Sequence, residues 1–288
     1  MILVLSLAAF AFAEDPTFVG AAAPAPVAAK PETKVQASAG GNFTVGNSEA
    51  VAFTSGVNVS HKWAKNQLGV VGAAAIGFGA ADANGDGFLS SSERCLGAGT
   101  AACAATAEQY SADGRYDRFL TEKSSVYVLV GGLHDKFAGF QLRSHGQIGY
   151  AVHAVEQKAT HLKLEVGADF ANEAYVPGVT PASARLLAAQ VGVGFDHAFN
   201  ESVSVTNALT LYEPVFTQPE GAPFAPHLTD VRVGNIAALN AKMTDKLSIQ
   251  VSDTLAWRNE PVAPPDGVTG TRSPFDNALS VALVASLL

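Results

Sequence analysis

Hydrophobic and polar residues alternate with a period of two along most of the chain. In THLKLEVGADF, residues 160–170, every second position from Leu162 to Phe170 is apolar, and the positions between them are mainly polar. FQLRSHGQIGYAVH repeats the pattern, with Phe140, Leu142 and Ile148 on its apolar side. A period of two is typical of β-strands with one apolar and one polar face. The sequence therefore predicts an all-β protein.

Twelve segments carry this alternation, at residues 35–46, 49–61, 66–79, 108–120, 124–134, 139–153, 160–173, 185–199, 202–213, 228–243, 246–259 and 275–288. They reach the roughly nine to eleven residues that a tilted membrane-spanning strand needs, whereas ordinary globular strands have about five or six. Short polar turns alternate with longer loops, found at 80–107, 174–184, 214–227 and 260–274. Hydrocarbon does not tolerate open sheet edges, so we expect a closed antiparallel up-and-down transmembrane β-barrel of about 12 strands, with its short turns in the periplasm. A soluble β-protein is the alternative that alternation alone leaves open.

The chain divides into three regions. Residues 1–13, MILVLSLAAFAFA, predict a secretory signal peptide that is cleaved after Ala13, although the usual positive residues at its start are missing. The Ala- and Pro-rich residues 14–33 predict a flexible periplasmic linker. Residues 34–288 then form the barrel, with residues 80–107 as an extracellular loop insertion.

The composition favours a membrane barrel over a soluble domain. Charged residues make up 15% of the chain, against roughly a quarter in ordinary proteins, which indicates a second apolar surface besides the core. After the signal, no uncharged apolar run is long enough for a membrane-spanning helix. The net charge of −8 and the lack of a basic run argue against a nucleic-acid partner. Aromatic residues near strand ends predict interfacial girdles, with Trp63, Tyr110, Phe119, Tyr150, Phe195, Tyr212 and Trp257 as members.

Charged residues on the polar side of the strands predict a network inside the barrel. Its expected members are Asp113, Arg115, Asp117, Arg143, His145, Lys163, Glu165, Asp169, Arg232 and Arg258. Two interpretations remain open: an ion-paired interior that keeps the barrel rigid, and a selectivity zone for small solutes. Small residues on the same side, such as Ser38 and Ala73, leave room for a lumen that the long charged side chains partly refill.

Three polar residues fall on the lipid-facing side of consecutive strands: Asn207, Asn235 and Asp253. A hairpin that pairs Tyr212 with Asp230 would place Asn207 opposite Asn235. Polar groups that face lipid are costly, so we expect a lateral seam for a homo-oligomer or for another protein partner. A β-bulge that reverses the local alternation is the competing explanation.

The segment DANGDGFLSSSE, residues 82–93, matches the calcium-loop pattern D-x-[DN]-x-[DN]-G-x5-E. The candidate ligands of a structural Ca²⁺ are Asp82, Asn84, Asp86, the carbonyl of Phe88, and Glu93. The flanking residues do not predict the helices of a paired EF-hand, and a solvated loop without an ion is the alternative. Cys95 and Cys103, the only cysteines, predict a local disulfide in the same loop, with two free thiols as the alternative.

Spaced motifs between residues 111 and 153 resemble a family of salt-induced outer-membrane proteins. They are Arg115-Tyr116-Asp117, Phe119-Leu120-Thr121, Asp135-x-Phe137-x-Gly139, Arg143 and Gly149-Tyr150. The resemblance covers about residues 35–288 and implies an outer-membrane barrel, with outer-membrane lipid and the barrel assembly machinery as partners. It implies no settled activity. The insertion 80–107 and the final Leu288, where such barrels commonly end in Phe, depart from the family pattern.

The sequence offers no catalytic constellation. It has neither a G-x-S-x-G nucleophile motif nor a phosphate-binding glycine loop, so we do not expect an enzyme. The predicted function is a narrow channel for small solutes or ions in the bacterial outer membrane, with a role in osmotic or salt stress. The alternative is a structural or partner-binding envelope barrel without transport activity.

Overall fold

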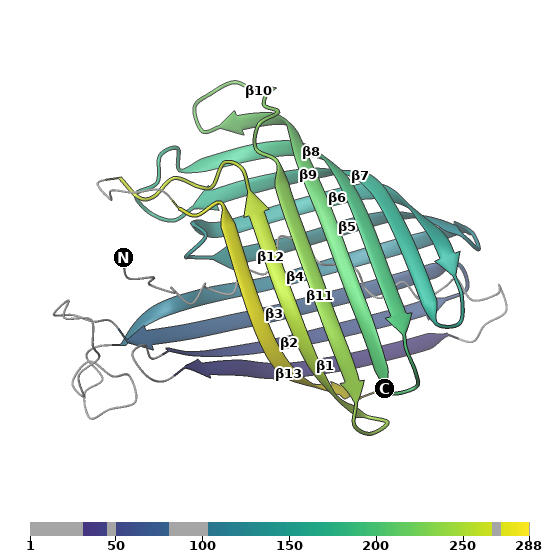
Figure 1. Ribbon diagram of the computed structural model, residues 1–288. Helices are drawn as coiled ribbons and strands as arrows, with labels where there is room; N and C mark the ends of the chain where they lie inside the picture. Colours follow the sequence, from purple (N-terminus) through teal and green to yellow (C-terminus); the bar gives the residue numbers. More distant parts are fainter. Residues whose placement is uncertain (1–30, 45–49, 81–102, 267–271, 288) are drawn as a thin grey trace.

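The alternating segments pair in sequence order to give a closed antiparallel β-barrel (Figure 1). This computed structural model describes residues 31–44, 50–80, 103–266 and 272–287. Its wall consists of β1 (Glu32–Thr44), β2 (Ala50–Trp63), β3 (Asn66–Ala80), β4 (Cys103–Thr121), β5 (Ser124–Asp135), β6 (Phe140–Glu156), β7 (Thr160–Tyr175), β8 (Ser183–Ala198), β9 (Val203–Pro219), β11 (Arg232–Lys242), β12 (Leu247–Arg258) and β13 (Phe275–Ser286). A further short strand, β10 (Ala225–Pro226), pairs with β9 only. The prediction of a closed 12-strand barrel is confirmed, and each predicted segment overlaps one strand of the wall.

The first and last strands close the ring. Their ladder pairs Gln36–Gly40 with Ala282–Ser286 and goes no further, whereas every other ladder of the wall has at least ten residue pairs. The two strands meet at their periplasmic ends and diverge toward the outer end (Figure 1). The outer ends of β1 and β13 are therefore not paired with each other.

Side chains separate by chemistry between the two sides of the wall. On the outside, Val130, Ile148 and Leu279 are 62%, 64% and 62% exposed. On the inside, Arg115 and Glu165 are almost fully buried. A closed wall with apolar groups outward and charged groups inward is the strand architecture that a lipid bilayer permits. The chain is therefore an outer-membrane barrel whose outer side faces lipid. Within the described residues, no helix is long and apolar enough to cross a membrane.

Three aromatic residues lie on the opposite side from the one predicted. The β5–β6 and β6–β7 ladders shift register at Phe140, so this ring is buried inside the barrel instead of facing lipid. Phe119 and Tyr212 also point inward and are buried, so they do not belong to the predicted girdles. Tyr110 and Tyr150 do lie exposed on the outside.

The barrel begins slightly earlier than expected. β1 starts at Glu32, two residues inside the predicted linker. The predicted signal peptide 1–13 and the linker up to residue 30 lie outside the described residues.

Candidate functional site in the barrel lumen

The ten predicted lumen residues all lie on the inner face of the wall. They come from β4, β6, β7, β11 and β12, and their side chains are at most 17% exposed. Their contacts group them into a periplasmic-side cluster around one arginine and a longer chain of ion pairs that reaches the outer end.

Arg115 is the centre of the periplasmic-side cluster. Its Nε and Nη2 atoms donate to the Asp117 carboxylate at 2.8 Å each, and Nη2 also donates to Glu165 Oε1 at 2.7 Å. Lys163 Nζ lies 2.8 Å from the same Glu165 oxygen. Such a forked, charge-assisted arrangement fixes both carboxylates, one on β4 and the other on β7. The cluster thus ties β4 to β7 across the lumen side.

An aromatic ring lies against this cluster because two glycines leave room for it. Tyr127 of β5 stacks under the Arg115 guanidinium at 4.0 Å and donates a hydrogen bond to Gln190 Oε1 at 2.7 Å. A Cβ at Gly149 would lie 2.5 Å from the ring, and one at Gly167 would lie 2.9 Å from the hydroxyl oxygen. Inward glycines on β6 and β7 therefore form the seat of Tyr127.

A second chain of ion pairs begins in the middle of the lumen. His145 places Nε2 3.2 Å from Asp113 and Nδ1 3.1 Å from Asp169. Arg143 then links Asp169, at 3.6 Å, to Glu173, at 3.4 Å. The histidine thus bridges carboxylates of two strands.

Glu173 and Asp230 complete the chain at the outer end. Arg232 Nη1 donates to Glu173 Oε1 at 2.8 Å, and its Nη2 donates to Asp230 Oδ2 at 2.6 Å. Arg258 donates to both Asp230 oxygens at 3.0 and 2.8 Å. Tyr175 donates to the second Glu173 oxygen at 2.7 Å. Two buried carboxylates thus hold two arginines of adjacent strands.

The charges of this ion-pair network nearly cancel. Five cations (Arg115, Arg143, Lys163, Arg232 and Arg258) face six carboxylates (Asp113, Asp117, Glu165, Asp169, Glu173 and Asp230), and His145 lies between two of these. Sequence reasoning missed Glu173, Asp230, Tyr127 and Gln190. The alternation of β7 continues to Glu173 and could have identified it, whereas Tyr127 lies in an apolar strand that gives no signal.

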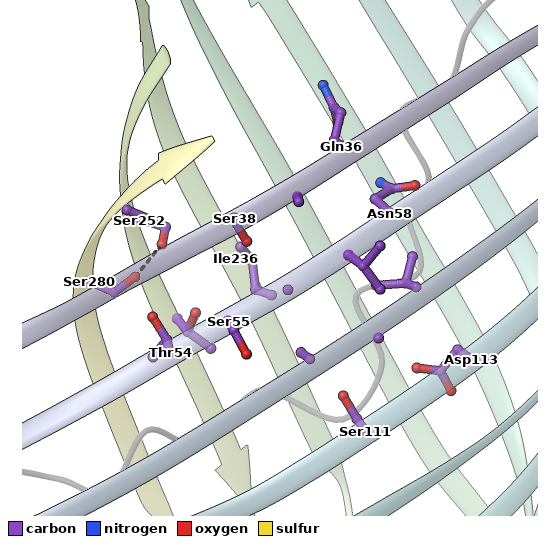
Figure 2. Close-up of a pocket in the computed structure, with 18 of the residues that line it drawn as sticks. Gln36, Ser38, Thr54, Ser55, Asn58, Ser111, Asp113, Ile236, Ser252 and Ser280 are labelled. Atoms are coloured by element: carbon purple, nitrogen blue, oxygen red, sulfur yellow. Dashed lines mark hydrogen bonds between the residues drawn. The ribbon is translucent and has the colours of Figure 1, made fainter. Parts of the chain in front are cut away.

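The other part of the inner wall carries small uncharged side chains. Between β1–β4 and β11–β13 lies a cavity of about 270 Å³. Its inward hydroxyl groups belong to Ser38, Thr54, Ser111, Ser252, Thr254 and Ser280. Figure 2 shows several of these groups and the 2.7 Å hydrogen bond between Ser252 and Ser280. The long charged side chains of the opposite wall therefore leave this central cavity open.

Two further cavities adjoin the central one. Toward the periplasm, a cavity of about 640 Å³ shares Gln36, Asn58 and Gln250 with it and reaches the turns at 199–202 and 243–246. Toward the outside, a cavity of about 200 Å³ shares Leu133 with it. The three cavities form a series along one side of the lumen.

Two outer connections fold over the outer end of this series. Val179 of the β7–β8 connection and Val262 of the β12–β13 connection pack against Phe140 inside the barrel. The Asp266 amide donates a hydrogen bond to the Gly178 carbonyl at 2.5 Å, which joins the two connections. The outer cavity lies beside this cap, with Phe140 and Val262 in its lining.

A polar tie also holds the outer rim. Glu260, which follows β12, accepts a hydrogen bond from the Thr229 hydroxyl and lies 2.9 Å from His227 Nε2. The Thr229 hydrogen bond, followed by the histidine, lowers the pKa of Glu260. The carboxylate therefore stays ionised, and keeps this tie, at a lower pH than an ordinary glutamate.

The predicted lateral seam lies on the lipid-facing side but in a different register. Arg232, not Asp230, pairs with Tyr212, so Asn207 lies opposite Ala237. Asn207 still reaches Asn235 diagonally, with its Nδ2 2.9 Å from Asn235 Oδ1. Asp253 makes an equivalent diagonal bond of 2.9 Å with Asn277, a residue that the sequence reasoning missed. The ladders through these residues show no register shift, so no bulge turns them inward.

The predicted calcium and disulfide sites cannot be placed in this fold. Asp82, Asn84, Asp86, Phe88, Glu93 and Cys95 lie outside the described residues, and of Cys103 only the backbone, paired with Ala80, is described. Both sites stay predictions. Elsewhere in the described chain, no three His, Cys, Asp or Glu side chains form a metal-binding group.

Comparisons with known proteins relate the chain to one family. It matches the family described as protein of unknown function, DUF481, over residues 37–286. No curated protein matches it. Similar solved structures include the translocator domain of autotransporter NalP from Neisseria meningitidis (8% identity, TM-score 0.43, covering 89% of this chain and 87% of that one), the KdgM porin (6%, 0.42, 89% and 100%) and OmpT of Vibrio cholerae (7%, 0.38, 91% and 100%). These identities are too low to relate the function of any of these proteins to this chain.

Proposed function

We propose that this chain, which belongs to DUF481, a family described as of unknown function, is a narrow channel for small solutes across the outer membrane. The observation that carries this proposal is the series of three adjoining cavities. They run from the outer cap to the periplasmic turns, and small side chains line much of the central one. A purely structural barrel gains nothing from leaving this space unfilled, because tight packing of the interior is stabilising.

The two walls of the lumen have different roles in this proposal. The charged wall is held by buried ion pairs and keeps its shape, and the small-residue wall provides the path. The central and outer cavities meet at Leu133, and the cap formed by Val179, Val262 and Phe140 lies beside the outer one. Slow passage of small molecules is therefore expected, and larger molecules are excluded.

Solute uptake by reconstituted liposomes tests the proposal. Purified barrel should admit small solutes faster than protein-free liposomes do. Ala73→Phe, which places a ring in the central cavity, should remove most of this uptake. Ala74→Phe, on the lipid-facing side of the same strand, is the matched control and should leave uptake unchanged. Uptake equal to that of protein-free liposomes, or equal inhibition by both variants, would count against a channel.

A role in osmotic adjustment fits such a channel. The sequence resembles a family of salt-induced outer-membrane proteins, and slow entry of small solutes would change the solute content of the periplasm. A strain that lacks the protein should recover more slowly from a salt upshift than the same strain complemented with the wild-type chain. Normal recovery of the strain complemented with Ala73→Phe would show that this role does not depend on transport through the central cavity.

The lateral seam favours a second candidate function, association within the membrane. Each diagonal pair, Asn207 with Asn235 and Asp253 with Asn277, makes one side-chain hydrogen bond. The Asn207 and Asn277 amides also donate to the Ile236 and Thr254 carbonyls. Other amide or carboxylate atoms of these residues still face lipid. A second copy of the barrel could bind these groups. The double variant Asn207→Leu/Asn235→Leu should then convert an oligomer to a monomer in detergent, as measured by light scattering. An oligomer of unchanged size would remove this candidate.

A further inference from the structure

The chemistry of the central cavity identifies the kind of solute that the path suits. Hydroxyl groups line the cavity on both sides: Ser38 and Thr54 come from β1 and β2, and Ser252, Thr254 and Ser280 come from β12 and β13. A hydroxyl group offers one donor and two acceptor positions, so it can replace water around a solute that itself carries hydroxyl groups. Ser252 and Ser280 already bond to each other at 2.7 Å and still keep acceptor positions.

Amide side chains continue this lining toward the periplasm. Gln36, Asn58 and Gln250 lie where the central cavity meets the periplasmic one. The Gln250 amide donates to Asn240 Oδ1 at 2.9 Å. Amides, like hydroxyl groups, both donate and accept hydrogen bonds without carrying charge. At this junction a solute therefore meets neutral polar groups.

Charged groups reach the central cavity at one edge only. They are Asp113, Arg143 and His145, and all three take part in the chain of ion pairs described above. Pores that conduct ions well replace the water around the ion with rings of charged side chains or of carbonyl oxygens. An ion in this cavity would lose part of its water shell and gain only hydroxyl contacts. Passage of an ion is thus disfavoured by its desolvation.

From these observations we infer that the channel selects small neutral solutes rich in hydroxyl groups, such as short polyols, over ions of similar size. This inference rests on the proposed channel function and adds the solute class. The volume of about 270 Å³ lies just below the range of typical small-molecule sites, which agrees with a short solute.

The test compares polyol uptake with ion conductance for the same preparations. Wild-type barrel in liposomes should take up glycerol and erythritol well above the protein-free rate. The same protein in planar bilayers should give only small conductance in potassium chloride, with little preference between cation and anion. Ions carried as readily as polyols would overturn the inference and leave the channel function standing. Uptake of neither would overturn the channel function itself.

A variant without the hydroxyl groups makes the test specific. Ser38→Ala/Thr54→Val/Ser252→Ala/Ser280→Ala keeps the side-chain volumes close and replaces both partners of the Ser252–Ser280 bond, so neither is left alone. Polyol uptake should fall about threefold or more, the factor expected for one net hydrogen bond lost, while the ion conductance stays the same. Ser144→Ala, on the lipid-facing side of β6, is the control. Circular dichroism confirms that each variant is folded, and unchanged polyol uptake in the folded quadruple variant would contradict the inference.

Discussion

The position of Tyr127 depends on the absence of two side chains. Its ring occupies the space that Cβ atoms at Gly149 and Gly167 would fill, and there it contacts Arg115 and Gln190. A glycine pair on adjacent strands thus allows one aromatic residue to brace the ion cluster. The arrangement converts a local gap in β6 and β7 into a contact among five strands of the wall, β4 to β8.

Gly149→Ala tests whether the absence of a side chain at this position makes room for the Tyr127 ring. The new methyl group overlaps the ring, so Tyr127 must shift and its hydrogen bond to Gln190 weakens. We expect a loss of about 1–3 kcal/mol in the free energy of unfolding, typical of overpacked interiors, measured by urea unfolding in lipid vesicles. Gly146→Ala on the outer side of the same strand has no close neighbour nearer than 3.9 Å and is the control. Equal effects of the two variants would contradict the assigned seat.

Arg115→Met tests the buried ion cluster. The change leaves Asp117 without its guanidinium partner and Glu165 with Lys163 alone. Removing one member of a buried ion pair commonly costs about 3–5 kcal/mol, because an uncompensated charge stays buried. Thermal unfolding of the reconstituted barrel should show this loss. Adding Glu165→Gln to Arg115→Met should restore part of it, and no restoration would indicate that Arg115 acts through packing instead.

At the scale of single residues, the sequence predicted which face of the wall a side chain lies on better than it predicted which residues that side chain contacts. Alternation placed Arg143 and Asp169 inward, because a strand turns successive side chains to opposite faces. It could not show that Glu173 joins Arg143 to Arg232, because cross-lumen contacts depend on strand tilt and shear. It was wrong for Phe140, because a register shift at the end of β6 is a property of the ladder and has no sequence signal there.

Strands β9, β11, β12 and β13 together carry a polar seam across an otherwise apolar surface. The exposed neighbours Leu209, Leu239 and Leu279 lie on the same side of the wall. The seam therefore lies inside the lipid-facing band. The sequence predicted its strands, and the error of two residues in the β9–β11 register arose because the long connection between these strands does not fix their pairing.

Replacing this seam with apolar residues should stabilise the barrel. Asn207→Leu/Asn235→Leu removes two amides from contact with lipid, and we expect a gain of about 1–3 kcal/mol in unfolding free energy for the monomer. The matched control is Asn240→Leu/Gln250→Leu, which replaces a hydrogen-bonded pair of the same kind on the inner face. Unfolding in detergent at protein concentrations that exclude association gives the comparison. A gain at the inner pair as large as that at the outer pair would refute the lipid-facing assignment.

At the scale of the whole molecule, the barrel is closed by its shortest ladder. The sequence predicted closure from the even number of strands, but it gave no measure of how far β1 and β13 pair. That extent depends on how the ends of the sheet meet after all other ladders have formed. The wall therefore has its fewest paired residues between the first strand, β1, and the last, β13.

A disulfide between these two strands should strengthen the barrel. Ala39 and Leu283 are direct partners, and partners in an antiparallel ladder have the Cα separation that a disulfide needs. In a Cys95→Ser/Cys103→Ser background, Ala39→Cys/Leu283→Cys should add about 2–4 kcal/mol when oxidised, measured against the reduced form. Phe53→Cys/Ile76→Cys, on the long β2–β3 ladder, encloses a shorter loop and should add less. A larger gain at this second pair would show that the β1–β13 line is not the weak one.

The short closing ladder also sets an order of events in time. β1 and β13 lie at opposite ends of the barrel sequence, so their pairing has the greatest loop-closure entropy and should form last during folding. In the finished protein, backbone amides that lack a partner strand exchange their hydrogens fastest. Amides at the outer ends of these two strands should therefore take up deuterium before those of the rest of the wall. Local opening of the barrel should thus begin at its outer rim, between β1 and β13.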